Sequence, residues 1–403
     1  MTLFKALAYR PFALLWAGQT LSRLGDNFSS IAFAWWVLEK TGSAAAMGTV
    51  LVFSRVPRLL LLMVGGAVVD RFPRVHIMII SDLLQGSALL LFAWGAINNS
   101  MELWHIFVIS AISGLAGAFF SPAYSALVPE ITPRDALPSA NSLSVLTGEA
   151  TGVIGPILAG LVVKASGVVV ALSIDGLSFF FSAMLLIPLL KLSATPALVI
   201  ESSSLWADIQ EGMRFVAKIR WLWMTIASAS LLNVTFGGPM NVLLPFLVND
   251  HFHMSADGLG ILLAAFSLGS ILVAAIIGSM YPLRLRGIKS YIAITLCGLL
   301  MVALGLSTSL FVGVIIMMGV GVFLTGGNLI FINVVQSFVP QEKMGRVSSL
   351  LNFGSQLLSP LGFVLAGWAA GQIGPLLVFV VGGVITAILG AMALLVPDIR
   401  RLD

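Results

Sequence analysis

The sequence predicts an all-α membrane protein with about twelve transmembrane helices, arranged as two pseudo-symmetric six-helix bundles. Three observations lead to this fold class. Of the 403 residues, 59% are hydrophobic and only 9% are charged, apolar runs of membrane-spanning length recur along the chain, and the second half repeats features of the first. Soluble domains are about 25% charged. A soluble enzyme, a nucleic-acid-binding protein and a disordered scaffold are therefore excluded as the main interpretation.

The apolar runs give the individual spans. A bilayer core of about 30 Å needs about 20 apolar residues in a helix, and charges, Pro/Gly clusters and Asn pairs separate runs of that length. We expect six spans before a polar stretch and six after it. They lie at residues 12–38, 45–69, 75–97, 103–128, 139–164, 168–191, 221–249, 258–281, 289–308, 310–338, 346–371 and 374–396.

The basic residues set the orientation of these spans, because cytoplasmic loops of membrane proteins are enriched in Lys and Arg. With the N-terminus in the cytoplasm, only Lys40 and Lys164 lie on the outer side and three arginines lie inside spans. All the other basic residues among the 21 lie on the cytoplasmic side. We therefore expect a multi-pass protein of the cell membrane (inner or plasma membrane) with both termini in the cytoplasm.

The polar stretch in the middle divides the chain into three parts. We expect an N-terminal six-helix bundle over residues 1–192, a cytoplasmic linker over 193–219 and a C-terminal six-helix bundle over 220–403. In the linker, apolar residues at helical spacing between Leu205 and Lys218 predict an amphipathic helix at the membrane surface.

A weak internal repeat relates the two halves. Matched residues keep a constant offset, which is 212 in an earlier group and 207 in a later one. The pairs are Gly66 with Gly278 and Arg74 with Arg286 in the first group, and Gly160 with Gly367 and Gly167 with Gly374 in the second. Parallel repeats of this kind are a transporter architecture, in which the substrate site lies near mid-membrane at the interface between repeats.

The loop between the second and third spans carries a recognisable motif. Residues 66–74 read Gly-Ala-Val-Val-Asp-Arg-Phe-Pro-Arg. The Gly allows close helix approach, the Asp lies at a helix end and the arginines hold the loop at the cytoplasmic face. The pattern resembles the signature loop of the major facilitator superfamily. The resemblance implies a conformational latch between the two halves, formed by Gly66, Asp70, Arg71 and Arg74.

Other stretches are similar to the branch of that superfamily that holds macrolide-efflux proteins and the enterobactin exporter. They include Trp-Ala-Gly-Gln at 16–19, Ala-Asn-Ser-Leu at 140–143 and Asp-Ile-Gln-Glu-Gly at 208–212. The resemblance implies an efflux transporter for small molecules. The arginine that the superfamily often carries in its fourth span has no counterpart between Val108 and Gly117. Proton coupling would therefore depend on another group.

Several charged side chains lie inside the spans, where a charge costs several kcal/mol and is retained for pairing or function. Near mid-depth the sequence places Arg23, Arg55, Arg58, Asp26 and Glu149, with Asp82 deep in the third span. Two interpretations stay open. The charges form internal ion pairs that fix helix register, or some of them stay unpaired and contact protons and substrate.

Two carboxylates are the candidates for proton coupling. Glu149 lies in an apolar stretch with no basic residue within a helical turn, so desolvation favours its proton-bound form. Asp26 is also a candidate. It ranks second because Arg23, three residues earlier, would keep its carboxylate ionised. The candidates for contact with substrate are Arg23, Arg55, Arg58, Asn233, Asn241, Asn328 and Gln356.

These features predict a secondary exporter of amphipathic small molecules, drug-like compounds or a siderophore, which works by proton-coupled antiport and alternating access. Two alternatives remain: a transporter of lipids, lysolipids or other organic anions, and a non-transporting membrane receptor. Because no phosphate-binding sequence G-x-x-x-x-G-K-[ST] occurs and the four histidines are peripheral, we expect no enzymatic activity, cofactor or metal site. The expected partners are the substrate, protons and membrane lipids, without nucleic acid, and we expect a monomer.

Overall fold

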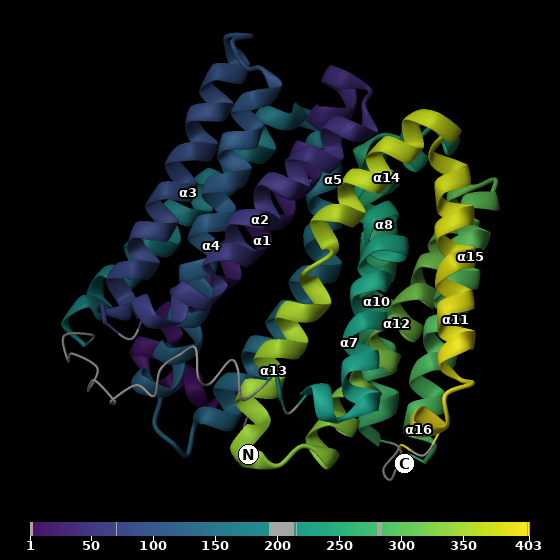
Figure 1. Ribbon diagram of the computed structural model, residues 1–403. Coiled ribbons are helices and arrows are strands. Elements are labelled where there is room, and N and C mark those ends of the chain that lie inside the picture. Colours follow the sequence, from purple (N-terminus) through teal and green to yellow (C-terminus); the bar gives the residue numbers. More distant parts are fainter. Residues whose placement is uncertain are drawn as a thin grey trace. The chain divides into compact units, whose positions relative to one another are not determined.

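The computed structural model describes residues 3–69, 71–192, 213–214, 216–279, 284–400 and 402. These residues are almost entirely helical and contain no β-strand (Figure 1), which confirms the all-α fold class. They pack into two compact units. Unit 1 comprises Met1–Gly42, Thr49–Ile200 and Ser255–Ala264, and unit 2 comprises Ser43–Gly48, Glu201–Met254 and Ala265–Asp403.

Unit 1 is built mainly from long, continuous helices. They are η1 (Lys5–Ala8), α1 (Arg10–Thr41), most of α2 (Ala44–Val69), α3 (Arg74–Ile97), α4 (Leu103–Ile131), α5 (Leu137–Leu186) and η2 (Ile187–Lys191). Prolines lie inside α2, α4 and α5, where neighbouring helices make such irregularities tolerable in a membrane.

Unit 2 contains more interruptions. Its elements are α7 (Arg220–Leu232), η3 (Asn233–Gly237), α8 (Gly238–Val242), α9 (Leu244–Phe246), η4 (Leu247–His251), most of α10 (Ala256–Ser279), α11 (Arg286–Leu306), α12 (Leu310–Phe338), α13 (Gln341–Gln356), α14 (Ser359–Ile373), α15 (Pro375–Ala393) and α16 (Pro397–Arg400). Both η3 and η4 are wider π-helical turns, a form that occurs mostly as single turns at functional sites.

Among the described residues, nine helices are long and apolar enough to cross a membrane, or ten if the bent pair Arg220–Val242 and Leu244–His251 is one span. The difference from about twelve has two sources. Helix α5 contains two of the expected spans in 50 residues. Helix α1 has 32 residues, but its polar and charged side chains, among them Arg23 and Asp26, lower its hydropathy.

Glycines with positive φ divide the two longest apolar stretches at equivalent places. Gly167 has φ of 83° inside α5, and Gly374 has φ of 83° between α14 and α15. A side chain disfavours this backbone conformation, so glycine is the default residue there. The two positions are matched in the sequence repeat, and the fold uses them in the same way.

The repeat extends to the closest helix crossings. A Cβ atom added to Gly86 of α3 would lie 2.9 Å from the carbonyl oxygen of Gly176 in α5, and one added to Gly298 of α11 would lie 2.6 Å from that of Gly383 in α15. Gly298 follows Gly86 by 212 residues and Gly383 follows Gly176 by 207. Small residues let backbones approach closely at such crossings. Each unit therefore contains one close glycine crossing between two of its own helices.

A second repeated contact lies at the N-terminal ends of α10 and α2. In unit 1, Gly160 packs on Ala256 at the start of α10, with 2.6 Å between an added Cβ and the Ala256 carbonyl oxygen. In unit 2, Gly367 packs on Ala44 at the start of α2 with the same 2.6 Å. Each unit thus includes the first turns of one helix that otherwise belongs to the other unit.

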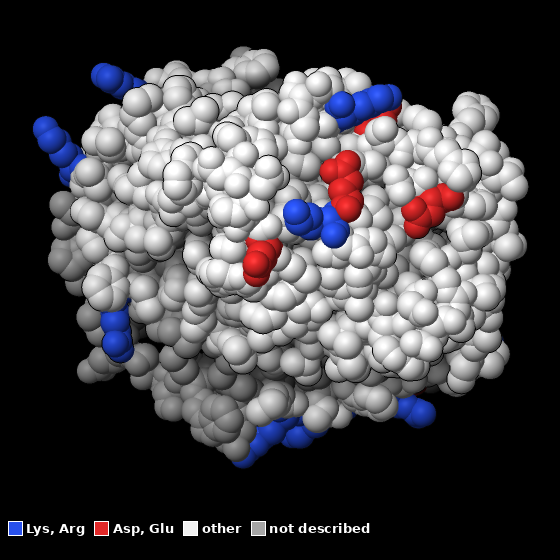
Figure 2. Space-filling model, turned by 90° about the horizontal axis from the view of Figure 1, so that it is seen from above, with Lys and Arg blue, Asp and Glu red and all other residues white. Residues whose placement is uncertain are grey.

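Most of the central linker, including residues 205–212 of the expected amphipathic helix, lies outside the described residues. The division into 1–192, 193–219 and 220–403 stays a prediction. On the face drawn in Figure 2, charged side chains are few among uncharged ones, in agreement with the composition.

Candidate functional site

Ion pairs in the described residues lie at the ends of helices. They are Lys5 with Asp135, Arg74 with Glu130, Lys164 with Asp257, and Arg220 with Asp398. No charged side chain from the middle of a described span takes part in one. The interpretation of the mid-depth charges as internal ion pairs is therefore not supported by the described part of the chain.

Arg23 on α1 turns toward α4 and α5. Its Nη1 donates a hydrogen bond to the carbonyl oxygen of Ser144 at 3.2 Å, and its guanidinium carbon lies 5.6 Å from the ring centre of Tyr124. A cation over an aromatic face is stabilised by the ring quadrupole. These contacts hold the guanidinium within unit 1, and Arg23 makes no ion pair with Asp26 three residues along the helix.

Arg55 and Arg58 lie one turn apart on α2, with Pro57 between them. Arg55 is partly buried and Arg58 is exposed. Neither forms an ion pair or hydrogen bond with a described residue. Two guanidinium groups without carboxylate partners on one helix can bind an anionic group.

The two acids that sequence reasoning favoured, Asp26 on α1 and Glu149 on α5, are both exposed. Neither forms an ion pair with a described residue. The roles of Glu149 and Asp26 in proton coupling stay predictions.

Two other carboxylates are completely buried. Asp82 on α3 and Asp175 on α5 each have 0% exposure. Both carboxylate oxygens of Asp82 and the Oδ2 of Asp175 lack a hydrogen-bond partner among the described residues. The hydroxyl of Ser178 lies 3.3 Å from Asp175 Oδ1, but it also donates to the backbone carbonyl of Asp175 at 2.8 Å. Burying an unpaired polar group is costly, so this pair needs a functional explanation.

Sequence reasoning missed Asp175, although a signal was present. Asp175, Ser178 and Ser182 follow at helical spacing, so they share one face of an otherwise apolar span. That face packs against α1, where a Cβ added to Gly25 would clash with Asp175 and Ser178. A polar stripe that faces other helices in a transmembrane segment indicates a functional position.

In unit 2 the polar candidates gather at a helix break. Helix α13 ends at Gln356 and α14 begins at Ser359, so the two form one interrupted helix (Figure 1). The break leaves carbonyl groups without their regular helical donors. The amide of Asn233 donates to the Ser355 carbonyl at 3.0 Å, and the hydroxyl of Ser230 donates to the Gly354 carbonyl.

The other polar candidates of unit 2 make local contacts. The amide of Asn241 donates to the carbonyl of Gly237 in the preceding turn at 2.8 Å and is exposed. Asn328 on α12 is exposed. Gln356 is the last residue of α13, and its carbonyl accepts the Ser359 hydroxyl at 2.8 Å. Among these four side chains, only Asn233 hydrogen-bonds to another helix in the described part of unit 2.

The expected latch is described only in part. Asp70 lies outside the described residues, as does the environment of Gly66. Arg71 is exposed, and Arg74 pairs with Glu130 at 2.5 Å, which joins the start of α3 to the end of α4 inside unit 1. A latch between the two halves stays a prediction.

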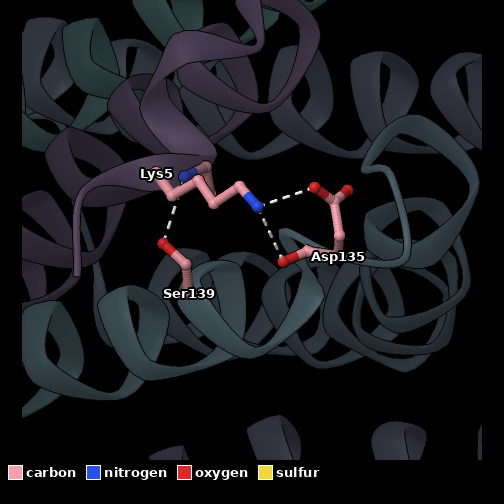
Figure 3. A network of polar contacts seen from close by, with 4 residues as sticks. Lys5, Asp135 and Ser139 are labelled. Atoms are coloured by element: carbon pink, nitrogen blue, oxygen red, sulfur yellow. Dashed lines mark hydrogen bonds and ion pairs between the residues drawn. The ribbon is translucent and has the colours of Figure 1, made fainter. Parts of the chain in front are cut away.

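A polar network anchors the N-terminal segment of unit 1 (Figure 3). The Nζ of Lys5 donates to Asp135 Oδ2 at 2.6 Å, and the Ala6 amide donates to the Ser139 hydroxyl at 3.1 Å. The hydrogen bond to Lys5 lowers the pKa of Asp135, and the same bond raises the pKa of Lys5. Both groups are therefore charged at neutral pH.

The architecture and its repeat agree with a comparison to known families. The family model of the Major Facilitator Superfamily matches residues 15–362. The chain belongs to the Major Facilitator Superfamily. Together with its apolar helices, this membership makes it a multi-pass membrane protein of a transporter family.

Relatives within the superfamily match nearly the full length. The multidrug efflux pump Tap of Mycolicibacterium fortuitum is 28% identical, over 97% of this chain and 96% of the relative. Macrolide efflux protein A of Streptococcus pyogenes is 24% identical, over 97% of both chains. The resemblance to an efflux branch of the superfamily is confirmed.

Two solved structures of transporters share the fold. A POT family transporter in complex with a thioalcohol-conjugated peptide has a TM-score of 0.77 at 10% identity, with 96% of both chains covered. A bacterial homologue of the iron transporter ferroportin has a TM-score of 0.71 at 19% identity and covers 95% of this chain and 98% of its own.

Proposed function

We propose that this superfamily member is a secondary exporter of amphipathic small molecules, drug-like compounds such as macrolides or a siderophore, driven by proton antiport through alternating access. Full-length similarity to proteins named as multidrug and macrolide efflux pumps carries the proposal. Acidic side chains inside the spans of unit 1 support the coupling to protons, because such groups mark proton relays in transporters.

The proposed roles follow the sequence-based candidates. Substrate contacts fall to Arg23, Arg55, Arg58, Asn233, Asn241, Asn328 and Gln356; proton exchange to Glu149 and Asp26; and the latch to Gly66, Asp70, Arg71 and Arg74. We place the protein in the cell membrane as a monomer, with both termini in the cytoplasm and with lipids and protons as its other partners.

The test uses two substrates of different chemistry. A bacterial host without its main drug pumps receives the full chain, and growth is measured against the macrolide erythromycin and the cationic dye ethidium. Purified protein in proteoliposomes is then tested for transport of the same compounds under an imposed pH gradient. We expect increased resistance to at least one compound and transport that depends on the gradient. The proposal would be contradicted if the protein transported neither compound and none of the other amphipathic drugs in a wider panel.

A second candidate, transport of lipids, lysolipids or other organic anions, is favoured by one observation. Arg55 and Arg58 have no carboxylate partner in the described part of the chain. Lysophosphatidylcholine and an anionic dye, tested in the same proteoliposomes with Arg55→Gln, distinguish this candidate. If the protein is an anion transporter, Arg55→Gln should weaken transport of the anionic compounds and leave ethidium transport unchanged.

A further inference from the structure

Asp82 and Asp175 are buried between helices of unit 1, and neither forms an ion pair with a described residue. Asp82 has 0% exposure with both carboxylate oxygens unpartnered, and Asp175 has 0% exposure with one unpartnered oxygen. An isolated ionised carboxylate costs many kcal/mol in an apolar environment, and such a group becomes neutral instead. Burial without an ion pair thus favours the proton-bound form of both side chains.

The groups around the two acids strengthen this assignment. The facing charged side chains come from α1, namely Asp26, which interacts electrostatically with both acids, and Arg23, whose guanidinium bonds to Ser144. Helix α4 has no charged side chain between His105 and Glu130. Helix α5 has none between Lys164 and Lys191 except Asp175 itself. The charged group that faces both acids is thus another carboxylate and not a cation.

The packing of the fold does not require these acids. Offsets of 212 and 207 place Ile294 where Asp82 lies in the repeat and Gly382 where Asp175 lies. Unit 2 makes the same crossing, through Gly298 and Gly383, with those apolar residues beside it. Two acids that are costly to bury and absent from the equivalent crossing are retained for chemistry.

A proton fits this site better than a metal ion. No group of three or more His, Cys, Asp or Glu side chains in the described residues is arranged to hold a metal, and the groups given around Asp82 include the hydroxyl of Ser182. The hydroxyl of Ser182 already accepts the amide of Gln19 at 3.2 Å. A proton needs no such ligand set.

Helix α1 brings a third acid next to the buried Asp175. Gly25 packs directly on Asp175 and Ser178, and the next residue, Asp26, is exposed. The missing side chain at Gly25 brings the backbone of α1 next to Asp175. An exposed acid thus lies beside a buried one.

We propose that Asp82 and Asp175 bind the coupling protons, and that Asp26 exchanges these protons between the buried pair and water. Binding converts each carboxylate to the neutral acid, and release returns the proton to water through Asp26. The proposal rests on the proposed proton-driven export, and it assigns the proton site to α1, α3 and α5 of unit 1.

Infrared spectroscopy of the purified full chain in lipid at pH 7 tests the site without a substrate. The wild type should show the carbonyl band of protonated carboxylic acids, which shifts in deuterated water. The double variant Asp82→Asn with Asp175→Asn should lose most of that band, while Asp26→Asn should keep it but exchange its deuterium more slowly. Asp250→Asn, an exposed acid of unit 2, is the matched control and should leave the band unchanged. An unchanged band in the double variant would overturn the assignment, and this result does not depend on folding of any variant other than the double one.

Transport then separates the site from the proposed function. In proteoliposomes, the double variant should lose erythromycin transport driven by a pH gradient by about tenfold or more, and retain exchange of labelled for unlabelled erythromycin without a gradient. Each single variant is a milder change and shows whether the protein still folds and binds erythromycin. Gradient-driven transport at the wild-type rate in all three variants would refute the coupling role. A wild type that ignores the gradient would instead contradict the proposed antiport, while the infrared band still decides the proton site.

Discussion

The two units are built from one repeat but distribute their polar groups differently. The spans of unit 1 contain seven charged side chains away from the ends of the spans: Arg23, Asp26, Arg55, Arg58, Asp82, Glu149 and Asp175. Its helices are regular except at the break at Gly167 in α5. The spans of unit 2 hold their charges at the ends, and its helices are interrupted by π-helical turns and the α13–α14 break. Unit 1 thus places charge in regular backbone, whereas unit 2 exposes backbone polar groups through irregular helices.

The comparison separates packing from chemistry. Both units cross two helices at a glycine pair, Gly86 with Gly176 and Gly298 with Gly383. Beside this shared contact, unit 1 carries Asp82 and unit 2 carries Ile294. What is common to both units supports the fold, and what differs between them is the place to look for function.

Exchanging the side chains at this crossing should have the largest effect. Ile294→Asp puts an unpartnered acid into an apolar cluster with Tyr291 and Ala393, and we expect it to lower the free energy of unfolding by on the order of 3 kcal/mol. Asp82→Val should leave stability unchanged or raise it, because it removes a buried unpartnered acid. Thermal unfolding in detergent measures both. Equal losses of stability in the two variants would show that Asp82 is structural.

The glycine crossings should respond alike in both units. Gly86→Ala and Gly298→Ala each force a Cβ against a backbone atom of the facing helix, and we expect each to cost about 1–3 kcal/mol of unfolding free energy. Gly117→Ala on α4, where an added Cβ meets nothing within 4 Å, is the control and should be neutral or slightly stabilising. A marked loss in only one unit would contradict a shared packing role.

The helix break of unit 2 should depend on its two donors. Asn233→Ala and Ser230→Ala remove the hydrogen bonds to the carbonyls of Ser355 and Gly354, and each should cost about 1–2 kcal/mol. Asn241→Ala removes a bond within one helix at an exposed site and should have little effect. Chemical denaturation compares the three variants. If Asn241→Ala were as harmful as Asn233→Ala, the bonds to the break would have no special role.

The smallest effect concerns the N-terminal anchor of unit 1 and its pH dependence. The lowered pKa of Asp135 adds stability above the usual pKa of an aspartate, and that stability is lost as the pH falls through the lowered value. The raised pKa of Lys5 adds stability below the usual pKa of a lysine, lost as the pH rises through the raised value. Proteolysis near the N-terminus should therefore increase only at acidic or strongly alkaline pH. Asp135→Asn should abolish the acidic increase, and an unaltered acidic profile in that variant would exclude the pair as its source.

Much of the fold could be predicted because apolar length and glycine positions are local signals. The ends of α2, α3, α12 and α15 lie within a few residues of the predicted spans, and the break at Gly167 falls where the repeat placed it. The π-helical turns of unit 2 were not predicted, because apolar length does not distinguish a π-helical turn from an α-helical one.

The candidate site was predicted less completely, because the direction of a side chain depends on its tertiary neighbours. Arg23 and Asp26 have the spacing of a pair, yet Ser144 and Tyr124 hold the arginine away. Glu149 lies in an apolar stretch but is exposed, whereas Asp175 is buried by the approach of α1 at Gly25. Sequence identifies the acids of a span, and only the packing shows which of them lose contact with water.

The paired glycine crossings also determine how the two halves of the chain tolerate random mutation. At each crossing a main chain contacts a main chain, so the crossing itself constrains the glycines more than it constrains the side chains one turn away. In a saturation library selected only for abundance at the membrane, Gly86 and Gly298 should be depleted of variants to a similar extent. When the library is selected for drug resistance, depletion should spread to Asp82 and leave Ile294 open to other apolar residues. Positions depleted only under drug selection would then identify the residues needed for transport, even before the substrate is known.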